Sequence, residues 1–240
     1  MKHASSSAEQ AAWYDKYYSG GRSLPAPWHR FLMPDLIAEC RPDHKLVELG
    51  CGQAHGLCYL AEKGHLPARQ IYGLDQSSEA VAYCRQEIPG GHFQVQDLHA
   101  MDYPAGMFDF CLLLETIEHL EHPETVLRRI YEILKPGGWF YISFPNYLHL
   151  PWFAVRLLSE WLNRPTWINL QPVDNIYTVF GIKKLVRAAG FEFVKGIGSS
   201  YGPPVLYRLE REWITKGLNS CGMWWWSFHP ILKFKKPVTS

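Results

Sequence analysis

Glu115, Glu118 and His119 stand close together in the segment 115–122, which reads ETIEHLEH. Two carboxylates and an imidazole at this spacing can chelate a hard divalent cation or move protons during a reaction. We interpret Glu118 and His119 as candidate catalytic residues, with His119 in contact with the substrate. The alternatives for His119 are a metal ligand and a cap for a helix that begins near Pro123.

The segment 47–56 (VELGCGQAHG) is typical of a tight turn between a strand and a helix. Gly50 and Gly52 allow the backbone to turn sharply and to approach a ligand with no Cβ in the way. An acid follows at Asp75, at the end of the next expected strand, where a carboxylate can accept both hydroxyls of a ribose. The alternative for Asp75 is a turn or helix-capping residue. Together these residues indicate a nucleotide-type cofactor.

A dinucleotide is the competing cofactor, and the same turn argues against it. The pattern G-x-G-x-x-G is missing, because His55 stands where its third glycine would be. A side chain there leaves little room for a pyrophosphate at the start of the following helix.

The elements that must position these residues alternate between strand and helix. We expect strands over 45–49, 70–74, 92–95, 108–114, 139–144 and 191–194, and helices over 56–63, 78–87, 123–134, 153–162 and 182–189. The nearly continuous apolar run at 108–114 is typical of a strand that is buried on both faces of a parallel sheet. The alternation predicts an α/β fold with a doubly wound, mostly parallel sheet. Ligands bind beyond the carboxyl ends of such strands, where Glu48, Asp75, Asp97 and Glu115 fall.

The composition is that of an ordinary globular protein. Of its 240 residues, 47% are apolar and 20% charged, and the formal net charge is +1. This balance disfavours a protein that binds nucleic-acid phosphates through a basic face. The six cysteines form no CxxC pair, which favours reduced thiols over a zinc site or a disulfide framework. With no secretory signal and no run of 18 apolar residues, we expect a cytoplasmic protein.

Five segments carry a resemblance to a known family: ELGCG (48–52), GLD (73–75), QDL (96–98), FDFCLLLE (108–115) and LKPGGWF (134–140). In order and spacing they resemble the successive motifs of class I S-adenosylmethionine-dependent methyltransferases, from about Trp13 to Gly196. The resemblance implies a seven-stranded Rossmann-like sheet with an insert after the fifth strand. It also implies S-adenosylmethionine as the cofactor and S-adenosylhomocysteine as the product.

The resemblance assigns roles to individual residues. It implies that Asp75 binds the ribose, that Asp97 accepts from the adenine amino group, and that Tyr14 and Tyr18 close over the cofactor. Ala54 stands where the family often has a third glycine, and we expect its small methyl group to be tolerated. The full set of implied cofactor-binding residues is Tyr14, Tyr18, Glu48, Gly50, Cys51, Gly52, Asp75, Gln76, Asp97, Leu98 and Glu115.

The resemblance also implies a division of the chain. We expect a single methyltransferase domain over residues 1–240. Its parts are an N-terminal cap (1–40), a cofactor-binding core (41–145), a substrate-side insert (146–180), and the rest of the sheet with an aromatic tail (181–240).

The E-x-x-E-H pattern at 115–119 resembles the metal-binding segment of small-RNA 2′-O-methyltransferases and of ubiquinone-pathway O-methyltransferases. A downstream histidine assists the metal in those families. Here Val173 stands near that position and is followed by Asp174. We therefore predict no metal ligands, with a divalent metal as the alternative.

The insert suggests the kind of acceptor. Its aromatic residues could line an apolar pocket or could simply pack the insert onto the core; they are Tyr147, Trp152, Phe153, Trp161, Trp167 and Tyr177. We predict methyl transfer to a small aromatic or apolar acceptor, at oxygen, with His119 as the base and His149 as a second candidate. The alternatives are a metal-dependent RNA 2′-O-methyltransferase and a non-catalytic cofactor-binding protein.

The tail 221–236 (CGMWWWSFHPILKFKK) combines aromatic residues with lysines, as membrane-interface anchors do. The stronger interpretation is burial as a final strand or in a homodimer interface, because tryptophan is also common in cores and interfaces. The expected partners are therefore a small-molecule substrate, a second copy of the chain and, through the tail, a membrane surface.

Overall fold

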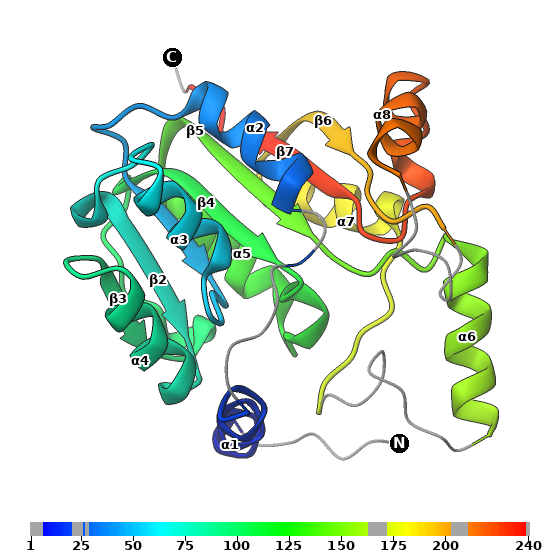
Figure 1. Cartoon of the computed structure of the whole chain (residues 1–240), viewed down its shortest axis with the longest axis horizontal. Helices are drawn as coiled ribbons and strands as arrows, with labels where there is room; N and C mark the ends of the chain where they lie inside the picture. The colour runs from blue at the N-terminus through cyan, green and yellow to red at the C-terminus, as the bar shows by residue number, and fades with distance from the viewer. Residues whose placement is uncertain (1–6, 21–25, 27–28, 163–171, 203–210, 239–240) are drawn as a thin grey trace.

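The computed structural model describes residues 7–20, 26, 29–162, 172–202 and 211–238. Seven strands form one sheet in the order β3-β2-β1-β4-β5-β7-β6 (Figure 1). The strands are β1 Leu46–Leu49, β2 Ile71–Asp75, β3 His92–Val95, β4 Phe108–Leu114, β5 Leu134–Ser143, β6 Glu192–Ile197 and β7 Ile231–Lys235. The helices are α1 Ser7–Tyr18, α2 His29–Glu39, α3 His55–Glu62, α4 Ser78–Glu87, α5 Pro123–Ile133, α6 Leu150–Trp161, α7 Val179–Ala188 and α8 Glu212–Ser220.

The sheet confirms the predicted α/β fold. The pairs β1–β2, β2–β3, β1–β4 and β4–β5 are parallel, and β7 alone runs antiparallel to its neighbours. The strand order reverses at β1, which lies between β2 and β4. This switch point is where an open parallel sheet forms a crevice at its carboxyl edge, so the fold itself directs attention to the ends of β1, β2 and β4.

Each face of the sheet carries its own apolar core. Residues of α2, α3 and α4, such as Leu36, Leu57 and Val81, pack together on one face. Residues of α5 and α7, such as Ile130 and Ile182, pack on the other. Two covered faces explain why β4 has an almost unbroken apolar sequence.

Asn146 joins three distant parts of the chain just after β5. Its side-chain amide donates hydrogen bonds of 2.9 Å to the carbonyl oxygens of Trp225 and Ser227, and its oxygen accepts from the amide of Val179 at 3.1 Å. The residue is fully buried. The segment 144–147 (FPNY) therefore links the sheet to the tail and to the start of α7.

Replacing Asn146 with alanine should lower the free energy of unfolding by about 2–4 kcal/mol, because it leaves several buried backbone groups without partners. Urea denaturation followed by circular dichroism measures the change. Gln86→Ala, at an exposed position of α4, is the matched control and should change the free energy by less than about 0.5 kcal/mol. Equal stability of the two variants would show that Asn146 does not hold these segments together.

The tail confirms the interpretation as a final strand, since β7 pairs with β5 on one side and β6 on the other. Lys233 is 2% exposed, and its Nζ lies 3.1 Å from Asp35 and 3.0 Å from Glu39 of α2. It is therefore not available to a lipid surface. Of the three consecutive tryptophans only Trp225 is exposed. No helix among the described residues combines the length and the apolar character that crossing a membrane requires.

The aromatic residues of the insert divide between packing and exposure. Trp152 is buried and stacks on Phe228 of the tail, with ring centroids 4.3 Å apart. Trp161 is 80% exposed at the end of α6, the helix that projects on the right of Figure 1. Trp167 lies outside the described residues. The helix expected over 153–162 begins earlier, at Leu150, because Pro151 occupies its first turn.

Candidate active site

A cleft opens at the carboxyl edge of the sheet, beneath helix α1. Most of the predicted site residues line it, namely Tyr14, Tyr18, Gly50, Asp75, Gln76, Asp97, Leu98, Glu115 and His119. Glu48, Cys51, Gly52 and Glu118 are not among its lining residues and are buried behind it. The structure thus brings together residues that are spread over more than a hundred positions of the sequence.

Asp75 holds the glycine turn in shape. Its Oδ2 accepts a hydrogen bond from the amide of Gly52 at 2.8 Å, and its Oδ1 accepts from the amide of Ser77 at 2.9 Å. Asp75 therefore acts as a turn residue, which is the alternative that the sequence left open. The same carboxylate faces the cleft and keeps lone pairs for a further donor.

The glycine turn needs the conformations that glycine permits. Gly50 has φ 69° and Gly52 has φ 48°, both in the left-handed region. A Cβ on Gly50 would lie 2.5 Å from Cγ2 of Thr116, and one on Gly52 would meet the hydroxyl of Tyr18. Ala54 also has a positive φ of 46°, which explains why glycine suits this position.

Helix α1 covers the cleft and is fastened at both ends. Oδ1 of Asp15 accepts a 2.7 Å hydrogen bond from Oγ of Ser77 and a 3.2 Å bond from the amide of Glu79 at the start of α4. Near the other end, Oγ of Ser7 donates to Oδ2 of Asp97 at 2.7 Å. These contacts position Tyr14 over the cleft.

Replacing Asp15 with alanine should release α1 and weaken the binding of S-adenosylhomocysteine by about fivefold, because a cap of this kind contributes about 1 kcal/mol. Titration calorimetry measures the dissociation constant. Lys16→Ala, at the exposed neighbouring position of the same helix, is the control and should leave the constant unchanged. Unchanged affinity in the Asp15 variant would show that α1 does not contribute to cofactor binding.

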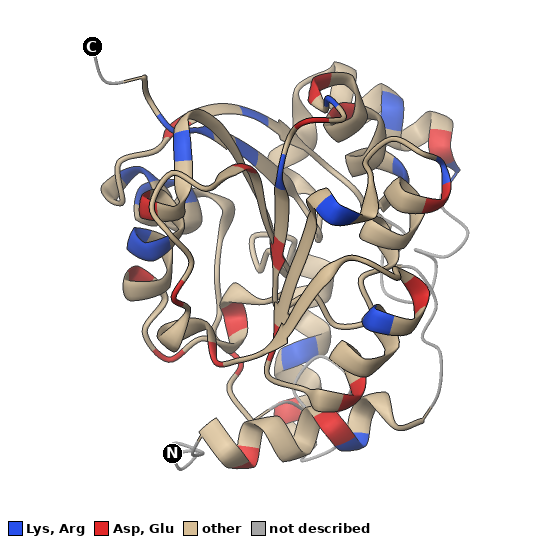
Figure 2. Cartoon of the chain, turned by 90° about the vertical axis from the view of Figure 1, so that its left-hand side faces the viewer, with Lys and Arg blue, Asp and Glu red and all other residues tan. Residues whose placement is uncertain are grey.

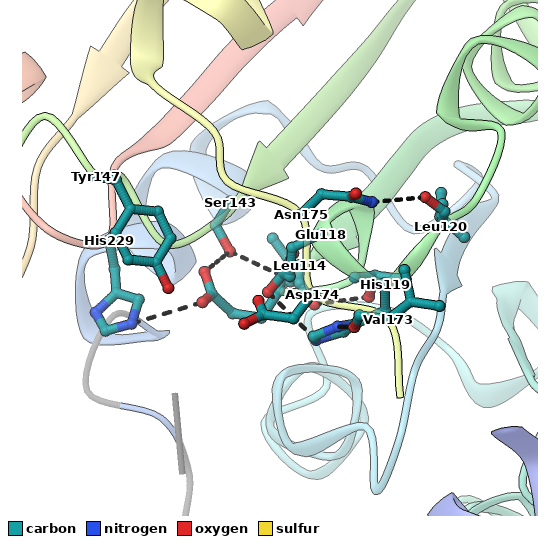
Figure 3. A network of polar contacts seen from close by, with 12 residues as sticks. Leu114, Glu118, His119, Leu120, Ser143, Tyr147, Val173, Asp174, Asn175 and His229 are labelled. Carbon is teal, nitrogen blue, oxygen red and sulfur yellow. Dashed lines mark hydrogen bonds and ion pairs between the residues drawn. The ribbon is translucent and has the colours of Figure 1, made fainter. Parts of the chain in front are cut away.

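His119 is fixed at the inner end of the cleft. Its Nδ1 lies 2.8 Å from the carbonyl oxygen of Val173, which can only accept, so this nitrogen carries the proton (Figure 3). Its Nε2 therefore holds the lone pair and lies 3.5 Å from Oε1 of Glu118. Burial lowers the pKa of His119 to about 4, so the ring is neutral at pH 7.

The glutamates of this region are buried and have raised pKa values. Glu115 accepts a 2.7 Å hydrogen bond from Oγ of Ser143, and its other oxygen lies 3.5 Å from Nε2 of His229. Burial raises the pKa of Glu115 to about 8 despite the hydrogen bond from Ser143. The pKa of Glu118 is raised by burial and then by the nearby carboxylate of Glu115. Burial and Asp75 raise the pKa of Glu48 to about 8.

Three partners in this network were not predicted from the sequence: His229, Arg156 and the carbonyl group of Val173. Nη1 of Arg156 lies 2.7 Å from Oδ2 of Asp174 and donates to the hydroxyl of Tyr147 at 2.8 Å. For the first of these pairs, the only signal in the sequence was Arg156 itself, which falls within the helix expected over 153–162. Nothing in the sequence indicated that His229 would reach Glu115.

His149 was predicted as a second candidate for the base, but the structure places it away from the cleft. It is fully buried, its Nε2 lies 3.0 Å from the carbonyl oxygen of Tyr201, and its ring packs against Trp226. It does not line the cleft. His149 lies at the start of α6. Aromatic residues of the tail, Trp226 and Phe228, pack against its ring and hold it between the insert and the tail.

Asp174 contacts a guanidinium group, so its carboxylate is not available as a metal ligand. Its carboxylate pairs with Arg156, and the Val173 carbonyl occupies Nδ1 of His119. Within the described ranges, no three His, Cys, Asp or Glu side chains are arranged to hold a metal ion.

Comparisons with known proteins agree with this geometry. Residues 47–142 match the family model described as a methyltransferase domain. A ubiquinone biosynthesis O-methyltransferase from Thiobacillus denitrificans is 25% identical over 70% of this chain and 73% of its own length. In this matched segment and in its fold, the chain is similar to the class I S-adenosylmethionine-dependent methyltransferases.

Other relatives differ in length and in the acceptor that they are named for. Phosphoethanolamine N-methyltransferase 3 of Arabidopsis thaliana is 30% identical over 66% of the chain, but the match spans only 31% of that relative. The structure of phosphoethanolamine N-methyltransferase 2 of Haemonchus contortus, in complex with S-adenosyl-L-methionine, has a TM-score of 0.64 at 14% identity. That match covers 94% of this chain and 56% of the other. The relatives include both N- and O-methyltransferases, so they do not define the acceptor atom.

The residues present fit S-adenosylmethionine, the cofactor that this similarity implies. Gly50 and Gly52 leave open the space that side chains would fill. Oε2 of Glu48 is buried and has no hydrogen-bond partner among the described residues. An unpaired buried carboxyl oxygen is costly unless a ligand donates to it, and the amino group of the cofactor's methionine part is such a donor.

Proposed function

We propose that the chain transfers the methyl group of S-adenosylmethionine to a hydroxyl oxygen of a small, largely apolar acceptor. The observation that carries this proposal is the state of His119. A neutral imidazole, with its proton directed to Val173 and its free nitrogen near Glu118, lies at the inner end of the cofactor cleft. That arrangement suits a base that removes a proton from a hydroxyl group.

The cleft residues would hold the cofactor in two parts. Asp75 would accept the ribose hydroxyls, with Gln76, Asp97 and Leu98 around the adenine. Glu48, Gly50, Cys51, Gly52 and Glu115 would surround the methionine part, and Tyr14 and Tyr18 would close over it. When bound, S-adenosylmethionine supplies an electrophilic methyl group on a positively charged sulfur.

The protein's part in the reaction is to orient the acceptor and remove one proton. Holding the acceptor oxygen in line with the methyl carbon contributes most of the rate in such displacements. Nε2 of His119 accepts the hydroxyl proton, and the adjacent carboxyl of Glu118 stabilises the resulting imidazolium. Helix α1 keeps water away from the reacting atoms.

Incubation with methyl-labelled S-adenosylmethionine and a panel of small hydroxyl-bearing molecules tests the proposal. We expect label in at least one organic acceptor, with an equal amount of S-adenosylhomocysteine. Binding of S-adenosylhomocysteine without transfer to any acceptor would favour the non-catalytic alternative. A folded protein that does not bind S-adenosylhomocysteine would overturn the assignment of the cofactor.

The RNA 2′-O-methyltransferase alternative receives less support. Along the ribbon in Figure 2, Lys and Arg positions are interspersed with Asp and Glu positions, and RNA binding favours a clustered basic surface. Magnesium-dependent transfer to a short RNA would nevertheless establish that function. The homodimer, the membrane contact, the cytoplasmic location and the division into cap, core, insert and tail stay predictions.

A further inference from the structure

The carboxyl group of Glu118 is buried with one oxygen unsatisfied. Its side chain is 3% exposed, and Oε1 lies 3.5 Å from Nε2 of His119. The other oxygen, Oε2, has no hydrogen-bond partner among the residues that the structure describes. Leaving such an oxygen unpaired is costly. The protein bears this cost directly behind the cleft, beside His119, which lines it, and a donor group on a ligand would offset it.

The surroundings of Glu118 are rich in acids and poor in cations. Glu115 and Asp174 are close enough for both to raise the pKa of Glu118, after the larger effect of burial. Figure 3 shows the side chains of Glu118, Asp174 and Tyr147 gathered in one region. The ligand that completes this region should therefore be positively charged.

The nearby basic groups are already engaged or neutral. Arg156 lies 2.7 Å from Asp174 and 2.9 Å from Glu160, so its single charge is shared between two carboxylates. Burial lowers the pKa of His119 to about 4 and that of His229 to about 3, so neither ring supplies a charge at pH 7. No described side chain here balances the charge of an ionised Glu118, which agrees with the raised pKa of its carboxyl group.

We propose that the acceptor carries a positively charged amine, which binds Oε2 of Glu118 while the hydroxyl to be methylated faces Nε2 of His119. This inference rests on the proposed function, because it places the acceptor at the same end of the cleft. The two protein groups are only 3.5 Å apart at Oε1 and Nε2. A hydroxyl and an amine on neighbouring carbon atoms can reach both, so the substrate class is a small vicinal amino alcohol.

The amine does not react in this scheme. The new carbon–oxygen bond forms as the carbon–sulfur bond of the cofactor breaks, and the hydroxyl proton goes to Nε2 of His119. The ammonium group keeps its proton and stays bound to Glu118. A charge-assisted hydrogen bond in a dry site discriminates strongly against a neutral group of the same shape, because that group leaves the carboxyl oxygen unpaired.

A matched pair of probes tests this specificity directly. Protein saturated with S-adenosylhomocysteine is titrated with 2-amino-1-phenylethanol and with 1-phenyl-1-propanol, in which a methyl group replaces the amine. We expect the amine to bind at least about tenfold more tightly. In Glu118→Gln this preference should disappear, while the neutral alcohol binds as before. Equal binding of the two probes to the unmodified protein, or no binding of the amine, would overturn the proposal.

The control is Glu124→Gln, which removes an exposed carboxylate from the first turn of α5 and should keep the full preference. A circular dichroism spectrum and the affinity for S-adenosylhomocysteine show whether Glu118→Gln is folded. If that variant fails to fold, the comparison of the two probes on the unmodified protein decides alone. Failure to bind S-adenosylhomocysteine would instead contradict the proposed function, so the two failures are distinguishable.

Discussion

Replacing Asp75 with alanine should weaken the binding of S-adenosylhomocysteine by at least about 100-fold. The carboxylate accepts hydrogen bonds from the amides of Gly52 and Ser77, so its removal releases the glycine turn at the same time as the proposed ribose contact. Each buried bond of this kind is worth about 1–3 kcal/mol when one partner is left unpaired, and 2.7 kcal/mol corresponds to about 100-fold in affinity. Titration calorimetry measures the loss.

Asp75→Asn separates the two contributions, because an amide oxygen can still accept from one backbone amide. We expect its affinity to lie between those of the alanine variant and the unmodified protein. Asp102→Ala, which removes an exposed carboxylate, is the control and should bind normally. If Asp75→Ala bound S-adenosylhomocysteine normally while folded, the cofactor would not lie against the end of β2.

Replacing His119 with alanine should lower kcat by about 10²–10⁴-fold, the usual contribution of a positioned base. The affinity for S-adenosylhomocysteine should change little, because His119 is not among the proposed cofactor contacts, most of which follow β1, β2 and β3. The structural reason is the orientation of the ring, which the Val173 carbonyl holds through Nδ1 at 2.8 Å. Initial rates with labelled S-adenosylmethionine and a saturating acceptor give kcat.

His122→Ala is the matched control for this experiment, since His122 is exposed only three positions further along. It should retain full activity. A rate for His119→Ala within about threefold of the unmodified enzyme would rule out general-base catalysis by this residue. Loss of cofactor affinity together with rate would instead assign His119 to binding.

The central strands were predictable because their signal is local. The apolar run 108–114 became β4 with the same bounds, and the turn at Gly50 followed the short strand before it. Helices α1, α2 and α8 were not predicted. In α2 an internal proline, Pro34, masks the helical pattern. The position of β7 between β5 and β6 depends on pairing across the chain, which no local pattern encodes.

The predictions for the site divide in the same way: the residues at the strand ends could be predicted from the sequence, and the contacts made by the insert and the tail could not. Acids at strand ends, such as Asp75 and Glu115, could be placed together because parallel strands end at one edge of the sheet. The partner of Glu115 from the tail, His229, and the Arg156–Asp174 pair required knowledge of how the insert and the tail fold back. Those contacts depend on the tertiary arrangement of irregular segments.

The place of β7 in the sheet sets an order on assembly. Strand β6 hydrogen-bonds only to β7 within the described sheet, and β7 is formed by residues 231–235. During synthesis, β1 to β5 can associate while the later chain is still being made, but β6 has no partner until β7 has emerged. Until then the outer edge of β5 stays open to pairing with other chains. A nascent chain that stalls before residue 231 would therefore expose an aggregation-prone strand edge beside an otherwise complete cofactor cleft.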